Sequence, residues 1–355
     1  MFLERSEQPE VQSCRAAFSP ALDTLVRPLR DLRISVTDRC NFRCVYCMPR
    51  SAFGEPYRFL DQQEQLRIDE IGRLARIFAE LGVEKVRLTG GEPLIRPNLE
   101  DLIAAISEVP GIDDVALTTN GSLLRRGRAA ALRQAGLRRV TISLDSLRDD
   151  VFRFISDAGV PVANVLSAID AAADAGLPVK INTVVRRGLN EDDILPLAER
   201  FRGSGHVLRF IEYMDAGNLN GWREEHVVPA REILTRIAER WPLEPAAPTR
   251  FGEVARRYRY VDGQGEVGII ASITQPFCDS CTRARLSADG RFFTCLFGTT
   301  GHDLRSLLRA GVDDDSIRSL LRAVWAARGD RYSMLRATHH RPGAIQKVEM
   351  YQIGG

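Results

Sequence analysis

Strand and helix patterns alternate along residues 32–213 of this 355-residue chain, and this alternation constrains the fold more than any other feature. We expect strands over Leu32–Thr37, Lys85–Thr89, Asp114–Thr119, Arg139–Leu144, Val179–Val185 and Val207–Tyr213. We expect helices over Gln65–Leu81, Asn98–Glu108, Gly127–Gln134, Ala163–Ala175 and Asp192–Arg202, with left-handed caps at Gly82, Gly136 and Gly176. Strands that alternate with helices form a parallel sheet or barrel. Six such units are fewer than the eight of a closed barrel, so we predict an α/β fold with a partial, six-unit parallel β/α barrel.

The expected strands carry polar residues at alternate positions. These residues are Arg33, Ser35, Thr37, Arg87, Thr89, Thr118, Asn120, Thr141, Ser143, Asp145, Lys180 and Asn182. Successive side chains of a strand point to opposite faces, so each set shares one face. We interpret this face as a barrel interior lined for a polar ligand; the alternative is a half-solvated sheet edge. Lys180 stands out because the chain has lysine only at positions 85, 180 and 347.

The seven cysteines form two separated triplets and one single residue. The triplets are Cys40, Cys44 and Cys47, and Cys278, Cys281 and Cys295; Cys14 stands alone and is interpreted as a bystander. A disulfide framework suits a short secreted chain. The spacing therefore predicts two metal sites, with the second in a C-terminal auxiliary-cluster domain.

Three cysteines can ligate three irons of a four-iron cluster and leave the fourth iron open. A structural zinc site needs four ligands, and no histidine lies near the first triplet, because the five are at 206, 226, 302, 339 and 340. Zinc with His302 as the fourth ligand stays an alternative for the second triplet. Arg283 and Arg285 follow Cys281 closely and could clamp phosphate groups, or they could be solvated surface charges.

Bulk composition excludes several classes. Hydrophobic residues make up 44% and charged residues 27%, and the net charge of +2 gives no reason to expect a nucleic-acid partner. We also expect no membrane span and no signal peptide. Cytoplasmic location follows as the expectation.

The first triplet has the spacing Cys-x-x-x-Cys-x-x-Cys, follows the first strand, and carries Tyr46 just before its last cysteine. With Gly90-Gly91-Glu92-Pro93 after the second strand, it resembles the radical S-adenosylmethionine superfamily. The resemblance implies that the open iron chelates S-adenosylmethionine. One electron then cleaves it to methionine and a 5′-deoxyadenosyl radical, which takes a hydrogen atom from the substrate.

Further motifs narrow the resemblance to the GTP 3′,8-cyclase (molybdenum cofactor biosynthesis protein A) family. They include residues 33–38 (RISVTD), 86–94 (VRLTGGEPL), 117–121 (LTTNG), 210–215 (FIEYMD), 277–286 (FCDSCTRARL) and the final Gly354-Gly355. The family implies conversion of GTP to 3′,8-cyclo-7,8-dihydro-GTP with two [4Fe-4S] clusters and S-adenosylmethionine. It also implies an electron donor protein, a downstream cyclic pyranopterin monophosphate synthase, and allows a homodimer.

The resemblance also implies the roles of individual residues. S-adenosylmethionine would be bound near Tyr46, Gly91, Glu92, Ser143 and Met214. GTP would meet Arg33, Arg87, Thr118, Lys180, Arg283 and Arg285, and the second cluster would bind guanine through its open iron. Catalytic roles would fall to Lys180, Arg283, Arg285, Gly354 and Gly355.

The terminal segment 351–355 (YQIGG) is either a frayed end or a functional tail. Glycine has no side chain and can enter a crowded cavity, and the apolar residues Val348, Met350 and Ile353 offer anchors. We therefore expect the tail to enter the barrel and position groups for the step after hydrogen abstraction.

The expected organisation is an N-terminal arm (1–28), a radical S-adenosylmethionine barrel (29–222), a C-terminal iron–sulfur domain (223–330) and the tail (331–355). Two other functions stay open at this point. One is a peptide-modifying radical enzyme whose second cluster transfers electrons, and the other is a non-catalytic iron–sulfur redox sensor.

Overall fold

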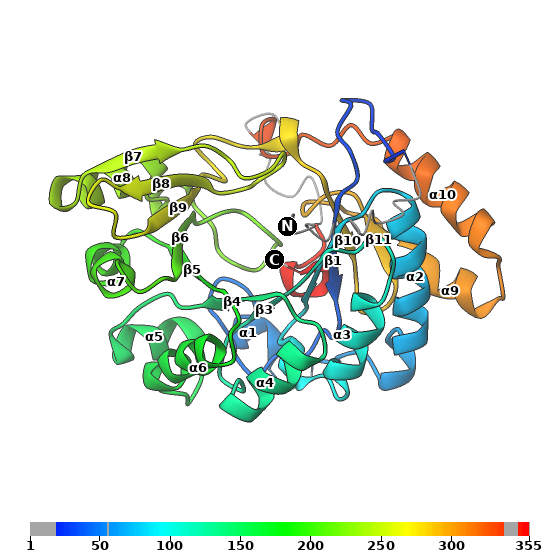
Figure 1. Ribbon diagram of the computed structural model, residues 1–355, viewed down its shortest axis with the longest axis horizontal. Coiled ribbons are helices and arrows are strands. Elements are labelled where there is room, and N and C mark those ends of the chain that lie inside the picture. The colour runs from blue at the N-terminus through cyan, green and yellow to red at the C-terminus, as the bar shows by residue number, and fades with distance from the viewer. Residues whose placement is uncertain (1–18, 55–56, 337–346, 355) are drawn as a thin grey trace, which may run out of the picture.

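A computed structural model describes residues 19–54, 57–336 and 347–354. Its centre is a curved sheet in which six parallel strands follow one another in chain order (Figure 1). The six strands are β1 (Asp31–Ser35), β2 (Lys85–Thr89), β3 (Asp114–Thr119), β4 (Arg139–Ser143), β5 (Val179–Val185) and β6 (Val207–Glu212). All six predicted strands are therefore present. Within the described ranges the two edges of the sheet, β12 and β7, do not pair with each other, so the predicted partial barrel is confirmed.

Helices cover the outer face of these strands, as Figure 1 shows. The connecting helices are α2 (Ile68–Glu80), α3 (Leu99–Ser107), α4 (Arg126–Gln134), α5 (Asp149–Ser156), α6 (Val162–Asp174) and α7 (Ile194–Phe201). Each strand buries aliphatic residues against them, among them Ile34, Leu88 and Ile142, each fully buried. The helix α5 was not predicted. Gly82, Gly136 and Gly176 have positive φ angles, as predicted for helix caps.

The second half of the chain adds strands to both edges of the six-stranded core. The strands β9, β8 and β7 continue the sheet beyond β6, while β10, β11 and β12 continue it beyond β1. Their bounds are β7 (Leu243–Ala246), β8 (Arg256–Tyr260), β9 (Glu266–Ile270), β10 (Arg283–Leu286), β11 (Arg291–Phe293) and β12 (His302–Asp303). The parallel pairing of β10 with β1 sets Arg285 beside Arg33. Sequence analysis gave residues 282–286 no strand, so β10 and its pairing with β1 were not predicted.

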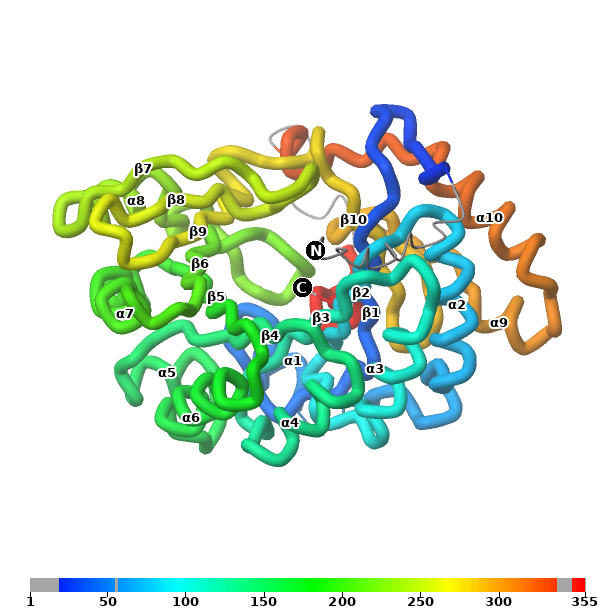
Figure 2. The backbone as a smooth tube through the Cα atoms, in the orientation of Figure 1, coloured from blue at the N-terminus to red at the C-terminus, as the bar shows by residue number. Residues whose placement is uncertain are grey.

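The remaining helices lie in the loops and in the C-terminal region. They are α1 (Arg50–Phe53), α8 (Ala230–Arg240), α9 (Leu304–Arg309), α10 (Asp314–Ala326) and α12 (Met350–Ile353), with 3-10 turns η1 (Gln62–Glu64), η2 (Pro93–Ile95), η3 (Glu191–Asp193), η4 (Glu224–His226) and η5 (Cys278–Ser280). The red segment in the middle of the curved sheet in Figure 2 is α12, which packs against β1. Among the described residues, no helix has the length and apolar character needed to cross a membrane.

Candidate active site

The first cysteine triplet lies on the loop that leaves β1 and leads into α1. The Gly90–Gly91 pair packs directly against the start of this loop: Gly91 N–H donates to Thr37 O at 2.8 Å, and Glu92 N–H donates to Arg39 O at 2.8 Å. A Cβ atom on Gly91 would lie 2.2 Å from Arg39 O. The glycines therefore permit two backbone segments, 37–39 and 90–92, to approach each other closely.

The cysteines of the first triplet are half-buried, lie close enough for their charges to interact, and are free of disulfides. Burial raises the pKa of Cys40 to about 11, with a further contribution from the charge of Glu92. Burial also raises the pKa of Cys44 well above its usual value, and the neighbouring Cys40 and Cys47 add to this effect. Mutual repulsion among three thiolates is relieved when they bind a cationic iron cluster, so these residues fit one.

A single zinc ion fits the cysteines less well. Across the described ranges, no three Cys, His, Asp or Glu side chains are grouped for one metal ion. The ligands of a four-iron cluster bind different irons and therefore stand farther apart than the ligands of one ion. His302, the alternative zinc ligand, lies on the edge strand β12 beside Phe292.

Two buried carboxylates lie near the first triplet. Glu92 is 1% exposed, and its oxygens accept hydrogen bonds from Thr119 Oγ1 at 2.6 Å, Asn120 N at 2.7 Å and Leu94 N at 3.0 Å. It thus ties the ends of β2 and β3 together, a scaffolding contact that sequence reasoning did not include. Asp145 accepts a 2.6 Å hydrogen bond from Tyr46 Oη. Burial raises the pKa of Glu92 to about 7 and that of Asp145 to about 6.

A large cavity occupies the inner side of the sheet, and most of its charged lining is cationic. All six predicted GTP residues line it: Arg33, Arg87, Thr118, Lys180, Arg283 and Arg285. Of the predicted S-adenosylmethionine residues, Met214 lines this cavity, and Ser143 ends β4 beside Asn182 of β5. Tyr46, Gly91 and Glu92 lie at the cysteine loop.

Six of the ten cations that line this cavity have no carboxylate partner among the described residues. Among the described residues, no carboxylate lies within ion-pair distance of Arg33, Arg87, Lys180, Arg209, Arg283 or Arg285. Burial and neighbouring arginines lower the pKa of Arg33 and Arg87, and burial together with Arg209 lowers that of Lys180 to about 8. Asn182 Oδ1 and Arg209 Nε are buried and find no hydrogen-bond partner within the part of the chain that the structure describes. The cavity therefore favours a polyanion with further polar groups.

Sequence reasoning missed several cations of this lining, namely Lys85, Arg139, Arg209, Arg250 and Arg328. The period-two pattern that singled out Lys180 and Asn182 continues in the next strand, where Asn182 lies beside Arg209. Extending the pattern by one strand would have found Arg209. Lys85 is paired with Asp31 at 3.1 Å, and its face is shared with Arg87.

The second triplet opens onto the same cavity, which Cys278, Cys281 and Cys295 all line. Arg283 donates a hydrogen bond to Cys281 Sγ at 3.3 Å. Although burial raises the pKa of Cys281, the charges of Arg283 and Arg328 lower it to about 6. Free thiols, one of them stabilised as a thiolate, are a donor set suited to iron.

The tail reaches Thr89 at the C-terminal end of β2. Arg285 Nη1 donates to Ile353 O at 3.0 Å and also to Gly354 O. Gly354 has a φ of 69°, and a Cβ atom there would lie 2.1 Å from Thr89 Cγ2. Upstream, Lys347 Nζ binds Asp215 Oδ2 at 3.0 Å and anchors the segment. The predicted residues Gly355 and Cys14 lie outside the described residues.

Comparison with known proteins agrees with this geometry. The family models named "Radical SAM superfamily" and "Molybdenum Cofactor Synthesis C" match residues 34–201 and 206–334. The GTP 3′,8-cyclase of Acidothermus cellulolyticus is 56% identical over 363 residues, spanning 95% of this chain and 99% of that protein. The chain belongs to the GTP 3′,8-cyclase family. Relatives of the same name from Xanthomonas axonopodis pv. citri and Staphylococcus aureus are 52% and 46% identical, over 95% and 94% of this chain and 99% and 98% of their own lengths.

Members of the GTP 3′,8-cyclase family are radical S-adenosylmethionine enzymes, so membership implies a [4Fe-4S] cluster with S-adenosylmethionine and a second cluster in the C-terminal region. The fold is also shared with Streptococcus suis SuiB bound to S-adenosylmethionine. That structure has a TM-score of 0.59 at 16% identity and covers 82% of this chain and 68% of SuiB. A second SuiB structure, bound to its precursor peptide SuiA, also gives a TM-score of 0.59, at 15% identity, over 90% of this chain and 75% of that one. Identities this low show a shared fold alone.

Proposed function

We propose that this protein converts GTP to 3′,8-cyclo-7,8-dihydro-GTP for molybdenum cofactor biosynthesis. One observation carries the proposal: a single cavity is lined by the second cysteine triplet and by a set of cations that have no carboxylate partner among the described residues, and one of these cations, Arg285, also binds Gly354 O of the tail. A nucleoside triphosphate has the matching parts. Its phosphates would neutralise the cations, and its base carries nitrogen and oxygen atoms that can ligate an open iron.

The cationic side chains bind and orient the triphosphate. Arg87 is held by hydrogen bonds to Thr118 Oγ1 at 2.8 Å and Thr141 Oγ1 at 3.1 Å, and Arg209 also donates to Thr141 Oγ1 at 3.2 Å. These bonds fix the guanidinium groups before the substrate arrives, so little ordering remains to be done on binding. Buried charge-assisted bonds to phosphate are strong.

The first triplet would hold one cluster through Cys40, Cys44 and Cys47, and the second triplet would hold another through Cys278, Cys281 and Cys295. Bound at the first triplet, the cluster and S-adenosylmethionine supply a carbon radical able to remove hydrogen from C3′ of GTP. Tyr46, Gly91, Glu92, Ser143 and Met214 stay the proposed surroundings of S-adenosylmethionine. The enclosing sheet and the tail exclude water from the reacting atoms.

Several finer points belong to this proposal. We assign the barrel to 29–222, the iron–sulfur domain to 223–330 and the tail to 331–355; the switch between the two family models falls earlier, between residues 201 and 206. An electron donor protein, a synthase that consumes the product and a homodimer follow from the resemblance alone, and a cytoplasmic location follows from the sequence analysis.

The test is anaerobic incubation of the reconstituted protein with dithionite, S-adenosylmethionine and each nucleoside triphosphate in turn, followed by mass spectrometry. We expect 5′-deoxyadenosine together with a cyclised product from GTP and not from ATP, CTP or UTP. A peptide-modifying enzyme would ignore all four nucleotides, and a redox sensor would yield no 5′-deoxyadenosine; either result would overturn the proposal.

A further inference from the structure

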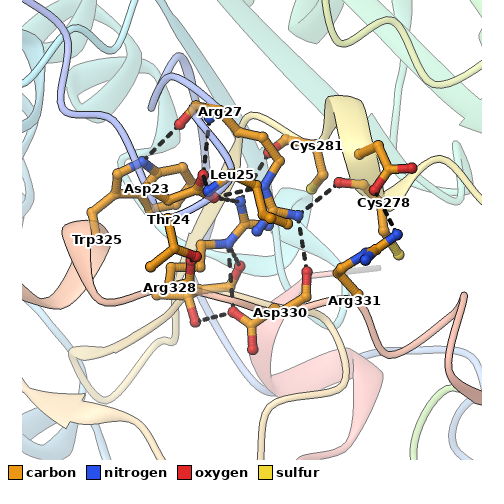
Figure 3. A network of polar contacts seen from close by, with 12 residues as sticks. Asp23, Thr24, Leu25, Arg27, Cys278, Cys281, Trp325, Arg328, Asp330 and Arg331 are labelled. Atoms are coloured by element: carbon orange, nitrogen blue, oxygen red, sulfur yellow. Dashed lines mark hydrogen bonds and ion pairs between the residues drawn. The ribbon is translucent and has the colours of Figure 1, made fainter.

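The described part of the N-terminal arm, residues 19–28, lies against the loops of the second cysteine triplet, although sequence reasoning gave the arm no role. Figure 3 shows the contact as a buried polar network. Its centre is Asp23, whose side chain is fully buried between two arginines, Arg27 at 2.6 Å and Arg328 at 2.8 Å. Both arginine side chains are 1% exposed. Charges this deeply buried persist only when they are paired and hydrogen-bonded.

Both arginines also donate hydrogen bonds to backbone carbonyls in or next to the cysteine loops. Arg27 Nη1 donates to Cys278 O at 2.7 Å and to Asp330 O at 2.9 Å. Arg328 Nη1 donates to Cys281 O at 3.0 Å, and Arg328 Nε donates to Thr294 O, next to Cys295, at 3.1 Å. Each of the three cysteines is thus tied to the network, through its own carbonyl or through that of the residue before it.

The rest of the network fixes the two arginines. The turn of the arm is closed by the bridge between Leu22 and Pro28, and Arg27 O accepts a 3.1 Å hydrogen bond from Trp325 Nε1 of α10. The Arg328 guanidinium lies over the Trp325 ring, 4.5 Å from its centroid. Arg27 Nη2 is buried without a partner among the described residues, so one donor is available to an acceptor that these residues do not supply.

We propose that Asp23, Arg27 and Arg328 form a clamp that positions the cysteines of the second cluster, so that its open iron faces the GTP cavity. The inference rests on the proposed function, which places a cluster at this triplet. The three are positioning residues, because they act through the cysteine loops. Hydrogen bonds that orient metal ligands from behind are a general requirement of metal sites. Arg328 also lines the GTP cavity, so the clamp joins the arm to the substrate side of the site.

The clamp depends on the planar guanidinium group, which donates several hydrogen bonds in fixed directions, and not on positive charge alone. A guanidinium binds a carboxylate and two carbonyls at once, whereas a lysine ammonium is a point charge on a flexible stem. Arg27→Lys and Arg328→Lys therefore keep the charge and lose the geometry. If the arginines acted only by attracting thiolates, lysine would replace them.

The experiment uses the full chain with Cys40, Cys44 and Cys47 changed to Ala, so that only the second cluster can form. Arg27→Lys, Arg328→Lys and Asp23→Asn are each added to this parent and reconstituted anaerobically. The matched control is Arg309→Lys, because Arg309 also pairs with a buried carboxylate, Glu70, and donates to two carbonyls, those of Gln63 and Gln65. Iron content, the rate of iron loss to a chelator, and the EPR spectrum of the reduced cluster with and without GTP are measured.

We expect the clamp variants to lose iron about 10–100-fold faster than the parent and to lose the spectral change on GTP addition. The Arg309→Lys control should release iron at the parent rate. Should Arg27→Lys fail to fold, as judged by circular dichroism, Asp23→Asn retains both arginines and provides the same test. Clamp variants that behave like the control would overturn the clamp. A parent that binds no cluster would instead overturn the proposed function.

Discussion

The two cysteine triplets lie in surroundings of opposite charge. The first lies near buried carboxylates, since the charges of Glu92 and Asp145 contribute to the raised pKa values of Cys40 and Cys44. The second lies among arginines: Arg283 and Arg328 outweigh burial and lower the pKa of Cys281 to about 6, whereas burial and the charge of Asp330 raise the pKa of Cys295 to about 11. The expected ligands differ in the same way: S-adenosylmethionine carries a sulfonium and an ammonium, whereas GTP is a polyanion. We therefore expect the charge around each triplet to favour S-adenosylmethionine at the first triplet and GTP at the second.

The most severe test of this comparison removes each triplet separately. Changing Cys40, Cys44 and Cys47 to Ala should leave one cluster and abolish cleavage of S-adenosylmethionine. Changing Cys278, Cys281 and Cys295 to Ala should also leave one cluster, yet some cleavage uncoupled from cyclisation should persist. Iron analysis and 5′-deoxyadenosine yield check both results. Stoichiometric zinc without iron at the second triplet would contradict the two-cluster account.

The tail contacts Thr89 of β2 and Arg285 of β10. Its loss should uncouple radical formation at the first triplet from cyclisation of GTP at the second. Gly354→Ala places a Cβ atom against Thr89 Cγ2 in a left-handed backbone conformation. Because misplacing reacting groups slightly can cost about 10²-fold in rate, we expect cyclised product to fall by that order while 5′-deoxyadenosine is still formed.

The control for the tail is Gly311→Ala. Gly311 has a similar φ of 75°, but no atom lies near its added Cβ. It should show ordinary backbone strain and normal cyclisation. Equal product from Gly354→Ala and Gly311→Ala, or deletion of Gly354 and Gly355 without loss of product, would show that the tail has no role in cyclisation.

Removing one cationic side chain from the cavity beside the second triplet should weaken the binding of GTP and leave the binding of S-adenosylmethionine nearly unchanged. Lys180→Ala or Arg209→Ala removes one partner of buried charge-assisted bonds, a loss of roughly 2–5 kcal/mol. S-adenosylmethionine binding should change little, since its surroundings are on the carboxylate side. Anaerobic calorimetric titration measures both affinities, with Arg126→Ala on the exposed surface of α4 as the control. Unchanged GTP affinity in both variants would remove the basis for the polyanion site.

The smallest expected effect is the pH dependence of GTP binding. Burial and the charge of Arg209 lower the pKa of Lys180 to about 8, so the ammonium form that phosphate needs is lost as the pH rises through that value. GTP affinity should therefore be highest below pH 8, and each pH unit above it should cost at most about tenfold. Lys180→Arg should flatten this decline because arginine keeps its proton. A decline of the same size in Lys180→Arg would assign the titration to another group.

Much of the barrel could be predicted because its signals are local. The strands β2, β3 and β5 begin and end where the sequence pattern indicated, and the predicted caps Gly82, Gly136 and Gly176, which follow α2, α4 and α6, have positive φ angles. The strand β10 could not be predicted in the same way. Its partner β1 lies about 250 residues away in the chain, and edge pairing between distant segments leaves no periodic signature.

The site divides similarly into a predictable and an unpredictable part. Cysteine spacing and period-two polarity indicated both triplets, Arg87 and Lys180, since these patterns reflect local geometry. Arg328 and the arm residues Asp23 and Arg27 left no such signal, because their importance comes from distant carbonyls that they reach only in the folded chain. The carbonyl contacts of Glu92 and Gly91 were hidden for the same reason.

The most direct test of the central claim follows a hydrogen atom between the two regions. Reconstituted protein is incubated anaerobically with dithionite, S-adenosylmethionine and GTP deuterated at C3′, and the products are analysed by mass spectrometry. A radical generated on the carboxylate side and a nucleotide held on the arginine side predict one deuterium in 5′-deoxyadenosine and its absence from the cyclised product. Unlabelled 5′-deoxyadenosine, or deuterium retained at C3′ of the product, would contradict the account.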